Sequence, residues 1–421
     1  MFFPAPRLSP LASPRFSALP PLSLYFHIPW CLRKCPYCDF NSHEARGPVP
    51  EQRYVEALIA DLESALPLVW GRKIYSVFFG GGTPSTFSAA GIEQIIGAVR
   101  ARAPLAVDAE ITLEANPGTF EAEKFRAFRA AGVNRLSIGV QSFNPRHLKA
   151  LGRIHDDGEA RAAIEIAMRN FDNVNLDIMY ALPGQNIAEA SADVESAIAC
   201  SPQHLSAYHL TIEPNTYFHR YPPQLPDDDT AANMQQEIEA LLAAAGYEHY
   251  ETSAFAKRMG NVLEEKQRSD FRLSPLSSRL SRLCLHNMNY WTFGDYLGIG
   301  AGAHSKLSFP GRIARQMRYK QPQQYMESAA AGSAIQEQHD VNVNEIGFEF
   351  MMNALRLNNG FPATLFEERA GVPLTVVLKQ LEEAERKGLI ERDHQRIAPT
   401  ALGRRFLNDL LQIFLTEKKP A

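Results

Sequence analysis

The chain has 421 residues, of which 45% are hydrophobic and 21% charged, an ordinary globular composition that excludes wholesale disorder. Its formal net charge of -4 gives no overall attraction to nucleic acid or to an anionic membrane. Five cysteines, an odd number, argue against a disulfide framework, and no apolar run reaches the ~18 residues of a membrane span. We therefore expect a cytoplasmic protein.

The first 21 residues combine six prolines with serines and arginines and contain no acidic residue. Transit peptides share part of this composition, but so many prolines would break the amphipathic helix that such a peptide needs. We expect residues 1–21 to be a disordered leader.

From Leu22 to about Tyr250, short β-branched or aromatic runs alternate with longer segments of helical period, which is typical of parallel βα units. Six such units predict an α/β fold, a partial (β/α)6-type parallel barrel over residues 22–257. A doubly wound sheet is the alternative that the periodicity leaves open. Polar residues and glycines at the strand ends favour the barrel, whose strand ends share one rim. The expected strands are Leu22–Ile28, Ile74–Phe79, Glu110–Glu114, Arg135–Val140, Asn173–Met179 and His204–Thr211.

The remainder of the chain divides into three parts. Residues 258–284 are rich in Arg, Ser and Leu without a period, which predicts an insertion or loop. Residues 285–340 are expected to be a connecting segment with one further strand and a glycine turn at Tyr296–His304. Residues 341–421 predict three helices, a small hairpin and a closing helix, a helical, winged-helix-like C-terminal domain. Because this domain lacks a basic stripe, we expect no nucleic-acid partner.

Three cysteines, Cys31, Cys35 and Cys38, lie on one loop after the first expected strand. Closely spaced thiolates can hold one iron–sulfur cubane and leave its fourth iron uncovered. A structural zinc site is the alternative, and it needs a fourth ligand such as His27 or His43. An uncovered iron would instead require a small chelating molecule, and hence a nucleoside pocket nearby.

Glycines and polar residues end the other expected strands. The turn Gly80–Ser85 offers backbone N–H groups and close approach to a charged ligand, although it lacks the Lys-Ser/Thr ending of a phosphate loop. Polar side chains are costly when buried without partners, so those at strand ends predict a wet or ligand-filled cavity. A structural hydrogen bond to a neighbouring turn is equally compatible. The polar residues concerned are Glu114, Gln141, Arg153 and Asp177.

Five motifs occur in a fixed order: C-x3-C-x2-C after LYFHIPW, then GGGTPS, EANPG, GVQSF and DIMYALPGQ. With them the chain, from Leu22 to Leu415, resembles the radical SAM superfamily, in particular the branch that holds oxygen-independent coproporphyrinogen III oxidase and a related haem chaperone. The resemblance implies a [4Fe-4S] cluster on the three cysteines, with S-adenosylmethionine (SAM) on the fourth iron. The implied SAM pocket consists of Tyr25, Tyr37, Gly81, Gly82, Thr83, Glu114, Gln141, Arg153 and Asp177.

Two features favour the chaperone within this branch. Where the oxidase has a further cysteine, two residues after the third cluster cysteine, this chain has Phe40. The segment His286-Asn287-Met-Asn-Tyr290-Trp291 matches HNxxYW, which resembles the haem-associated signature of the chaperone. Histidine is a natural axial ligand of haem, and Tyr and Trp pack against porphyrins, but a histidine beside aromatic residues is equally compatible with ordinary core packing.

The resemblance therefore implies a haem chaperone that binds the cluster, SAM and haem as cargo. It would transfer haem to apo-haemoproteins, respiratory enzymes among them. Oxidative decarboxylation of coproporphyrinogen III is the alternative function, and whether the chain is an enzyme stays open. A peripheral membrane contact and a cluster-dependent homodimer also stay open. About 20 residues more than the family pattern precede HNxxYW, which leaves the delivery of His286 to its place uncertain, although loops tolerate such length.

Overall fold

The computed structural model describes residues 13–258 and 282–415, and its largest unit is one curved sheet. Within these residues the sheet has 12 strands, and the seven from β11 to β8 are parallel. Antiparallel strands extend both edges, so the sheet does not close. In sheet order the strands are β14 (Ile335–Asp340), β13 (Arg312–Arg318), β12 (His304–Phe309), β11 (Asp295–Ile299), β1 (Leu22–Ile28), β4 (Ile74–Gly81), β5 (Leu105–Ala115), β6 (Arg135–Gln141), β7 (Val174–Tyr180), β8 (His204–His209), β10 (Ala254–Lys257) and β9 (Tyr247–Glu251).

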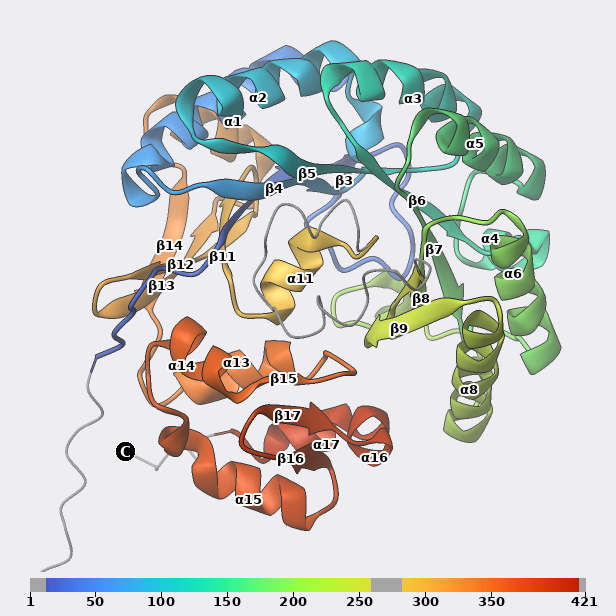
Figure 1. Ribbon diagram of the computed structural model, residues 1–421. Coiled ribbons are helices and arrows are strands. Elements are labelled where there is room, and N and C mark those ends of the chain that lie inside the picture. Colours follow the sequence, from blue (N-terminus) through green and yellow to red (C-terminus); the bar gives the residue numbers. More distant parts are fainter. Residues whose placement is uncertain (1–12, 259–281, 416–421) are drawn as a thin grey trace, which may run out of the picture.

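Helices cover the convex face of the sheet (Figure 1). Strand β1 is buried over nearly its whole length, as expected for a parallel strand enclosed on both faces. Local signals start several helices; α5 and α6 each begin with a complete capping box. The helices of this layer include α1 (Glu51–Ala65), α2 (Ala89–Arg102), α3 (Thr119–Ala131), α4 (Pro145–Ala150), α5 (Asp157–Asn170), α6 (Ile187–Ala199), α8 (Asp228–Ala244) and α12 (Pro322–Ala330).

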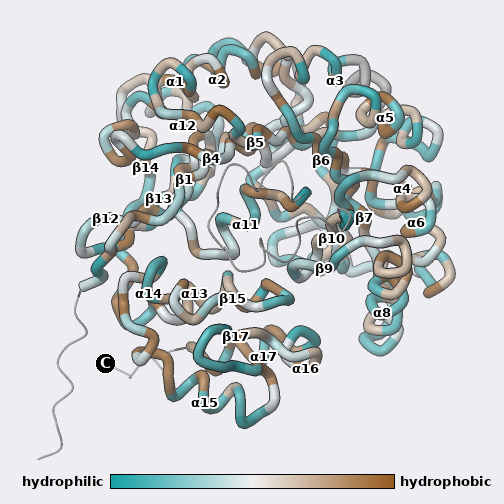
Figure 2. Tube along the Cα trace, in the orientation of Figure 1, coloured by the Kyte–Doolittle hydropathy of each residue, from teal (hydrophilic) through white to brown (hydrophobic). Residues whose placement is uncertain are grey.

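The expected partial parallel barrel is confirmed, and the fold is α/β with an open, curved, largely parallel sheet. The most hydrophobic stretches follow the parallel strands, as Figure 2 shows for β5 and β6. One helix, α11 (Leu285–Trp291), lies on the concave side of the sheet, where it contacts β4, β1 and β11.

Residues 285–340 contain more regular structure than a connecting segment. Besides α11 they supply β11, the further strand expected at Tyr296–His304, which the structure pairs in parallel with β1, and then the antiparallel strands β12, β13 and β14. Most of the insertion expected at 258–284 lies outside the described residues.

The C-terminal region has a core of its own, into which Phe350, Phe361 and Phe366 pack. The expected helices and hairpin are present, with an additional short strand, β15, on the hairpin's edge. The closing helix is divided in two at Phe406, whose backbone leaves the helical region. Its elements are α13 (Ile346–Ala354), β15 (Phe361–Pro362), α14 (Ala363–Ala370), α15 (Leu378–Arg386), β16 (Ile390–Arg392), β17 (Arg396–Pro399), α16 (Ala401–Arg405) and α17 (Leu407–Gln412).

The expected disordered leader is wrong for residues 13–21, while residues 1–12 lie outside the described part. Arg15 N donates to Gly371 O at 2.7 Å, and Phe16 packs against the C-terminal core. Pro20 O accepts a hydrogen bond from Arg72. Prolines prevent a helix here but not an extended segment that finds partners on the folded body.

Candidate functional site

A cavity of about 630 Å³ opens on the concave side of the sheet. Side chains from β1 and β4 through β8 line it, together with the cysteine loop and α11. All residues that the sequence suggested for the cluster, SAM and haem lie on its wall: Tyr25, Cys31, Cys35, Tyr37, Cys38, Gly81, Gly82, Thr83, Glu114, Gln141, Arg153, Asp177, His286, Asn287, Tyr290 and Trp291. The residues suggested for SAM and those suggested for haem thus line one and the same cavity.

The cysteine loop connects two short paired strands, β2 (Trp30–Cys31) and β3 (His43–Glu44). All three thiols are free, and burial raises the pKa of Cys31 to about 11. Cys38 Sγ lies 3.6 Å from Ser42 Oγ, while Arg153 Nη1 donates to Cys35 Sγ at 3.6 Å. Three thiols on one loop beside a guanidinium form a donor set that suits an iron–sulfur cluster carrying net negative charge.

The zinc alternative finds no support in the geometry. His27 has both ring nitrogens engaged, Nδ1 with Tyr25 OH at 3.0 Å and Nε2 with Asn41 O at 2.9 Å. His43 is not among the residues that line the cavity. In residues 13–258 and 282–415, no three His, Cys, Asp or Glu side chains, the three thiols included, are gathered around a single ion position, so it is the placement of the two histidines that disfavours zinc.

The glycine turn after β4 packs tightly against β1. Gly81 has φ of 117°, and a Cβ there would lie 2.6 Å from the His27 ring; a Cβ on Gly82 would lie 2.6 Å from Trp30 O. Any larger residue would displace the turn, so these glycines are required by packing. The turn is also polar on its cavity side, since Gly81 N donates to Glu114 Oε2 at 3.3 Å.

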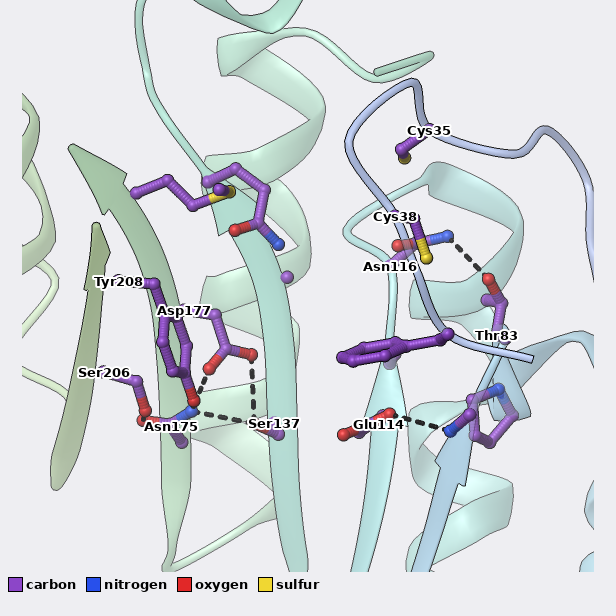
Figure 3. Close-up of a pocket in the computed structure, with 18 of the residues that line it drawn as sticks. Cys35, Cys38, Thr83, Glu114, Asn116, Ser137, Asn175, Asp177, Ser206 and Tyr208 are labelled. Carbon is purple, nitrogen blue, oxygen red and sulfur yellow. Dashed lines mark hydrogen bonds between the residues drawn. The ribbon is translucent and has the colours of Figure 1, made fainter. Parts of the chain in front are cut away.

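Two carboxyl groups of the cavity wall, on β5 and β7, lie on either side of β6 (Figure 3). Burial and the nearby Asp177 raise the pKa of Glu114 to about 8. Burial also raises the pKa of Asp177, although Ser137 Oγ donates to it at 3.1 Å and Asn175 Nδ2 at 2.9 Å. A pair of poorly solvated acids favours a cationic ligand between them, because a nearby positive charge stabilises the ionised form.

Arg153 connects the cysteine loop with the strand ends. Its Nη2 donates to Asn116 Oδ1 at 2.9 Å and also to Gly139 O. Asn116 Nδ2 in turn donates to Thr83 Oγ1 at 3.3 Å. The contact with Cys35 completes a chain of hydrogen bonds across β4, β5 and β6 that fixes the mouth of the cavity.

Gln141 ends β6 in an unusual backbone conformation. Its φ of 68° lies in the left-handed region, which non-glycine residues rarely occupy, and the pairing with β7 shifts register at this point. Strained residues of this kind concentrate at functional sites, where the surrounding fold holds them in place.

Two tyrosines line opposite parts of the cavity. The Tyr25 ring stacks on Phe78 with centroids 6.2 Å apart, and its hydroxyl bonds to His27. Tyr37, on the cysteine loop, tilts against Phe218 at 6.4 Å. Both rings offer flat apolar faces next to polar groups, as a nucleoside pocket requires.

His286 lies near the beginning of α11 and is 3% exposed. The carboxylate of Glu110 caps this helix, accepting from Leu285 N and His286 N at 3.2 Å each. The imidazole stacks on Phe78 at 4.9 Å. Burial and the charge of Arg135 lower the pKa of His286 to about 3, so the ring is neutral at physiological pH.

The hydrogen bonds of His286 determine which nitrogen carries the proton. Ser76 Oγ lies 3.2 Å from Nδ1 and gives its only proton to Ser23 Oγ at 2.7 Å. Ser76 therefore accepts from Nδ1–H, and Nε2 keeps its lone pair. No described residue makes a hydrogen bond to Nε2. A neutral imidazole with a fixed Nδ1–H is the form that binds a metal through Nε2.

The other residues of the motif surround this histidine. Tyr290 stacks on Tyr296 with centroids 4.1 Å apart, and Arg356 lies over the Trp291 ring at 4.3 Å. Trp291 Nε1 is buried without a partner among the described residues. Asn287 lines the cavity. The motif thus presents a histidine and two aromatic rings to one space.

Some polar residues of the wall were not identified from the sequence. Asn116 lies within the EANPG motif, and only its spacing to Glu114 could have suggested a role. The others occupy inward positions of strands, where alternate residues face the cavity, and no local signal distinguishes them. They are Arg135, Ser137, Asn175, His204, Ser206 and Tyr208. Ser76 and Glu110 were missed as well; they do not line the cavity but bond to His286.

Family comparisons agree with this fold. Residues 25–197 match the model of the radical SAM superfamily, and residues 341–406 match the HemN C-terminal domain. The solved coproporphyrinogen III oxidase (HemN) from Escherichia coli, described as a radical SAM enzyme, has the same fold, with a TM-score of 0.77 at 24% identity over 94% of this chain and 90% of that one. The chain is therefore a protein of the radical SAM class.

Two curated relatives narrow the family. The protein named heme chaperone HemW from Escherichia coli K12 is 46% identical over 404 residues, 95% of this chain and 99% of that protein. The protein of the same name from Mycobacterium tuberculosis H37Rv is 31% identical over 97% of this chain and 99% of its own length. The chain belongs to the HemW family.

Proposed function

We propose that this protein is a haem chaperone that binds haem, a [4Fe-4S] cluster and SAM, and that transfers haem to apo-haemoproteins. The observation that carries the proposal is the neutral His286, whose unprotonated Nε2 has no described hydrogen-bond partner and whose side chain lines the same cavity as the three cysteines. The name shared by the relatives at 46% and 31% identity supports it.

In this proposal Cys31, Cys35 and Cys38 hold the cluster, and the SAM pocket consists of the strand-end residues. The buried acids Glu114 and Asp177 bind the cationic ligand, and the chain of hydrogen bonds through Arg153 keeps the cysteine loop over them. When bound, the cluster and SAM supply one-electron chemistry at the sulfonium carbon–sulfur bond.

His286 would bind the haem iron through Nε2, while Tyr290 and Trp291 would pack against the macrocycle. The test is a haem titration of the full chain. We expect a saturable Soret shift at near-equimolar haem, and in His286→Ala an affinity lower by at least about 100-fold, because loss of an outer-shell partner alone costs about 10–100-fold.

His339→Ala is the matched control, since this histidine is exposed on the edge strand β14 and does not line the cavity. Equal haem affinity of His286→Ala and His339→Ala would contradict ligation by His286. A wild-type chain without a saturable Soret shift would refute the chaperone proposal itself.

Coproporphyrinogen III oxidase activity is the second candidate, because the overall fold is that of HemN. Phe40, 60% exposed, is part of the cavity lining at the place where the oxidase pattern has a cysteine. We expect the cluster-loaded chain, supplied with SAM and a reductant under anaerobic conditions, to form no protoporphyrinogen. Formation of that product would favour the oxidase.

We further propose that the protein acts in the cytoplasm, where its five cysteines stay reduced, and that its haem recipients include respiratory enzymes. None of the helices in the described part of the chain is both long and apolar enough to cross a membrane. A peripheral membrane contact and a cluster-dependent homodimer belong to the same proposal, and no nucleic-acid partner does.

A further inference from the structure

Arg135, the first residue of β6, is a buried cation without a direct partner. It is 2% exposed and lines the cavity. Its Nε is buried without a hydrogen bond, and among the described residues its guanidinium makes no hydrogen bond or ion pair. An arginine is always charged, and a buried charge left unpaired is costly.

The acids nearest to Arg135 accept hydrogen bonds from other groups. Glu110 accepts from Leu285 N, from His286 N and from Cys284 Sγ at 3.7 Å. Asp177 accepts from two other side chains of the wall, as described above. These carboxylates act on Arg135 through their charge alone. The planar fork of donors on the guanidinium is therefore available to a carboxylate from outside the chain.

The position of Arg135 identifies which carboxylate fits. It begins β6, whereas the cysteine loop follows the other end of the parallel strand β1, so the two lie toward opposite ends of the cavity. Arg135 and His286 both line the cavity, and β6, which carries Arg135, lies beside β5, whose Glu110 bonds to the first turn of the helix that carries His286. SAM would place its carboxylate at the cluster. The carboxylates expected on the side of His286 are those of a tetrapyrrole.

We propose that Arg135 binds a carboxylate, namely a propionate of the tetrapyrrole bound at His286. The end of the cavity away from the cysteine loop, where Arg135 and His286 lie, we call its floor. This inference rests on the proposed haem function. It gives the floor two contacts with one ligand, the iron at His286 and an acidic substituent at Arg135, and so fixes the orientation of the macrocycle.

The test compares the binding of metal-free protoporphyrin IX with that of its metal-free dimethyl ester. Neither ligand contains iron, so ligation by His286 contributes to neither affinity. Only the diacid carries charged propionates, so the difference in affinity measures their contribution. We expect the wild-type chain to bind the diacid about tenfold more tightly than the diester, the effect of one charge-assisted hydrogen-bonded pair. In Arg135→Gln this preference should disappear. Arg129→Gln is the matched control, because Arg129 is exposed and its closest ionic partner is Asp172 on the surface.

Arg135→Lys serves if Arg135→Gln does not fold, as judged by circular dichroism. It keeps the charge without the fork of donors, and we expect an intermediate preference. The inference is overturned by a wild-type chain that binds diacid and diester equally, or by a folded Arg135→Gln that keeps the wild-type preference. A wild-type chain that binds neither haem nor porphyrin contradicts the haem function together with this inference. A chain that binds haem but does not prefer the diacid contradicts the role of Arg135 alone.

Discussion

The two ends of the cavity are built differently. At the mouth, the cysteine loop is held by backbone contacts and by long polar side chains, and Cys35 and Cys38 are partly exposed. On the floor, His286 and its partner Ser76 are 3% and 0% exposed, and buried side-chain hydrogen bonds fix them. The mouth therefore suits a cofactor that completes it, whereas on the floor the protein alone orders His286 and leaves Arg135 for the ligand to pair.

The largest expected effect is a loss of cluster and SAM binding at the mouth that leaves haem binding at the floor intact. Simultaneous substitution of Cys31, Cys35 and Cys38 by alanine should abolish cluster iron and SAM binding, measured by iron content and calorimetry. Because the floor does not depend on these thiols, haem affinity should change by less than about threefold. Parallel loss of haem binding would show that the two ends are one cooperative site.

A smaller effect tests how the floor is organised. In Ser76→Ala the imidazole loses its Nδ1 acceptor, so haem affinity should fall by about tenfold and the Soret and ligand-field bands should shift. Ser333→Ala, on an exposed turn, is the control. If Ser76→Ala leaves both affinity and spectrum unchanged, the orientation of His286 does not depend on this hydrogen bond.

A third effect, on stability instead of binding, concerns the buried acid near the mouth. The folded pKa of Glu114, about 8, exceeds its ordinary value, so its contribution to stability is complete below pH ~4.5 and is lost as the pH rises toward 8. Wild type should therefore lose stability relative to Glu114→Gln by at most about 1.4 kcal/mol per pH unit in that range. Urea unfolding of the cluster-free chain at several pH values measures it, and a pH-independent difference would contradict the raised pKa.

The mouth could be predicted from the sequence better than the floor. The cysteines, the glycine turn and the strand-end polar residues are local motifs, and the structure brings them all to one cavity. Arg135, Ser76 and Glu110 acquire their setting from strand register and from the docking of α11, which are long-range properties without a local pattern.

The same distinction applies to the fold. Strand β1 was predicted to the residue because its apolar run is enclosed on both faces. Strand β14 was missed since all six of its residues are exposed, which removes the alternation that marks a half-buried strand. Residues 13–21 were misjudged because proline content reports on helix formation and not on contacts with the body.

Strand β14 also has a consequence for how copies of this protein meet. It forms one edge of the open sheet, and an edge offers unpaired backbone groups to any other strand. Apart from Ile335, its sequence, IQEQHD, is polar and carries two acids, so a second sheet would find little apolar surface to bury and like charges opposite one another. The composition that hid this strand from prediction is what protects the molecule against aggregation along that edge.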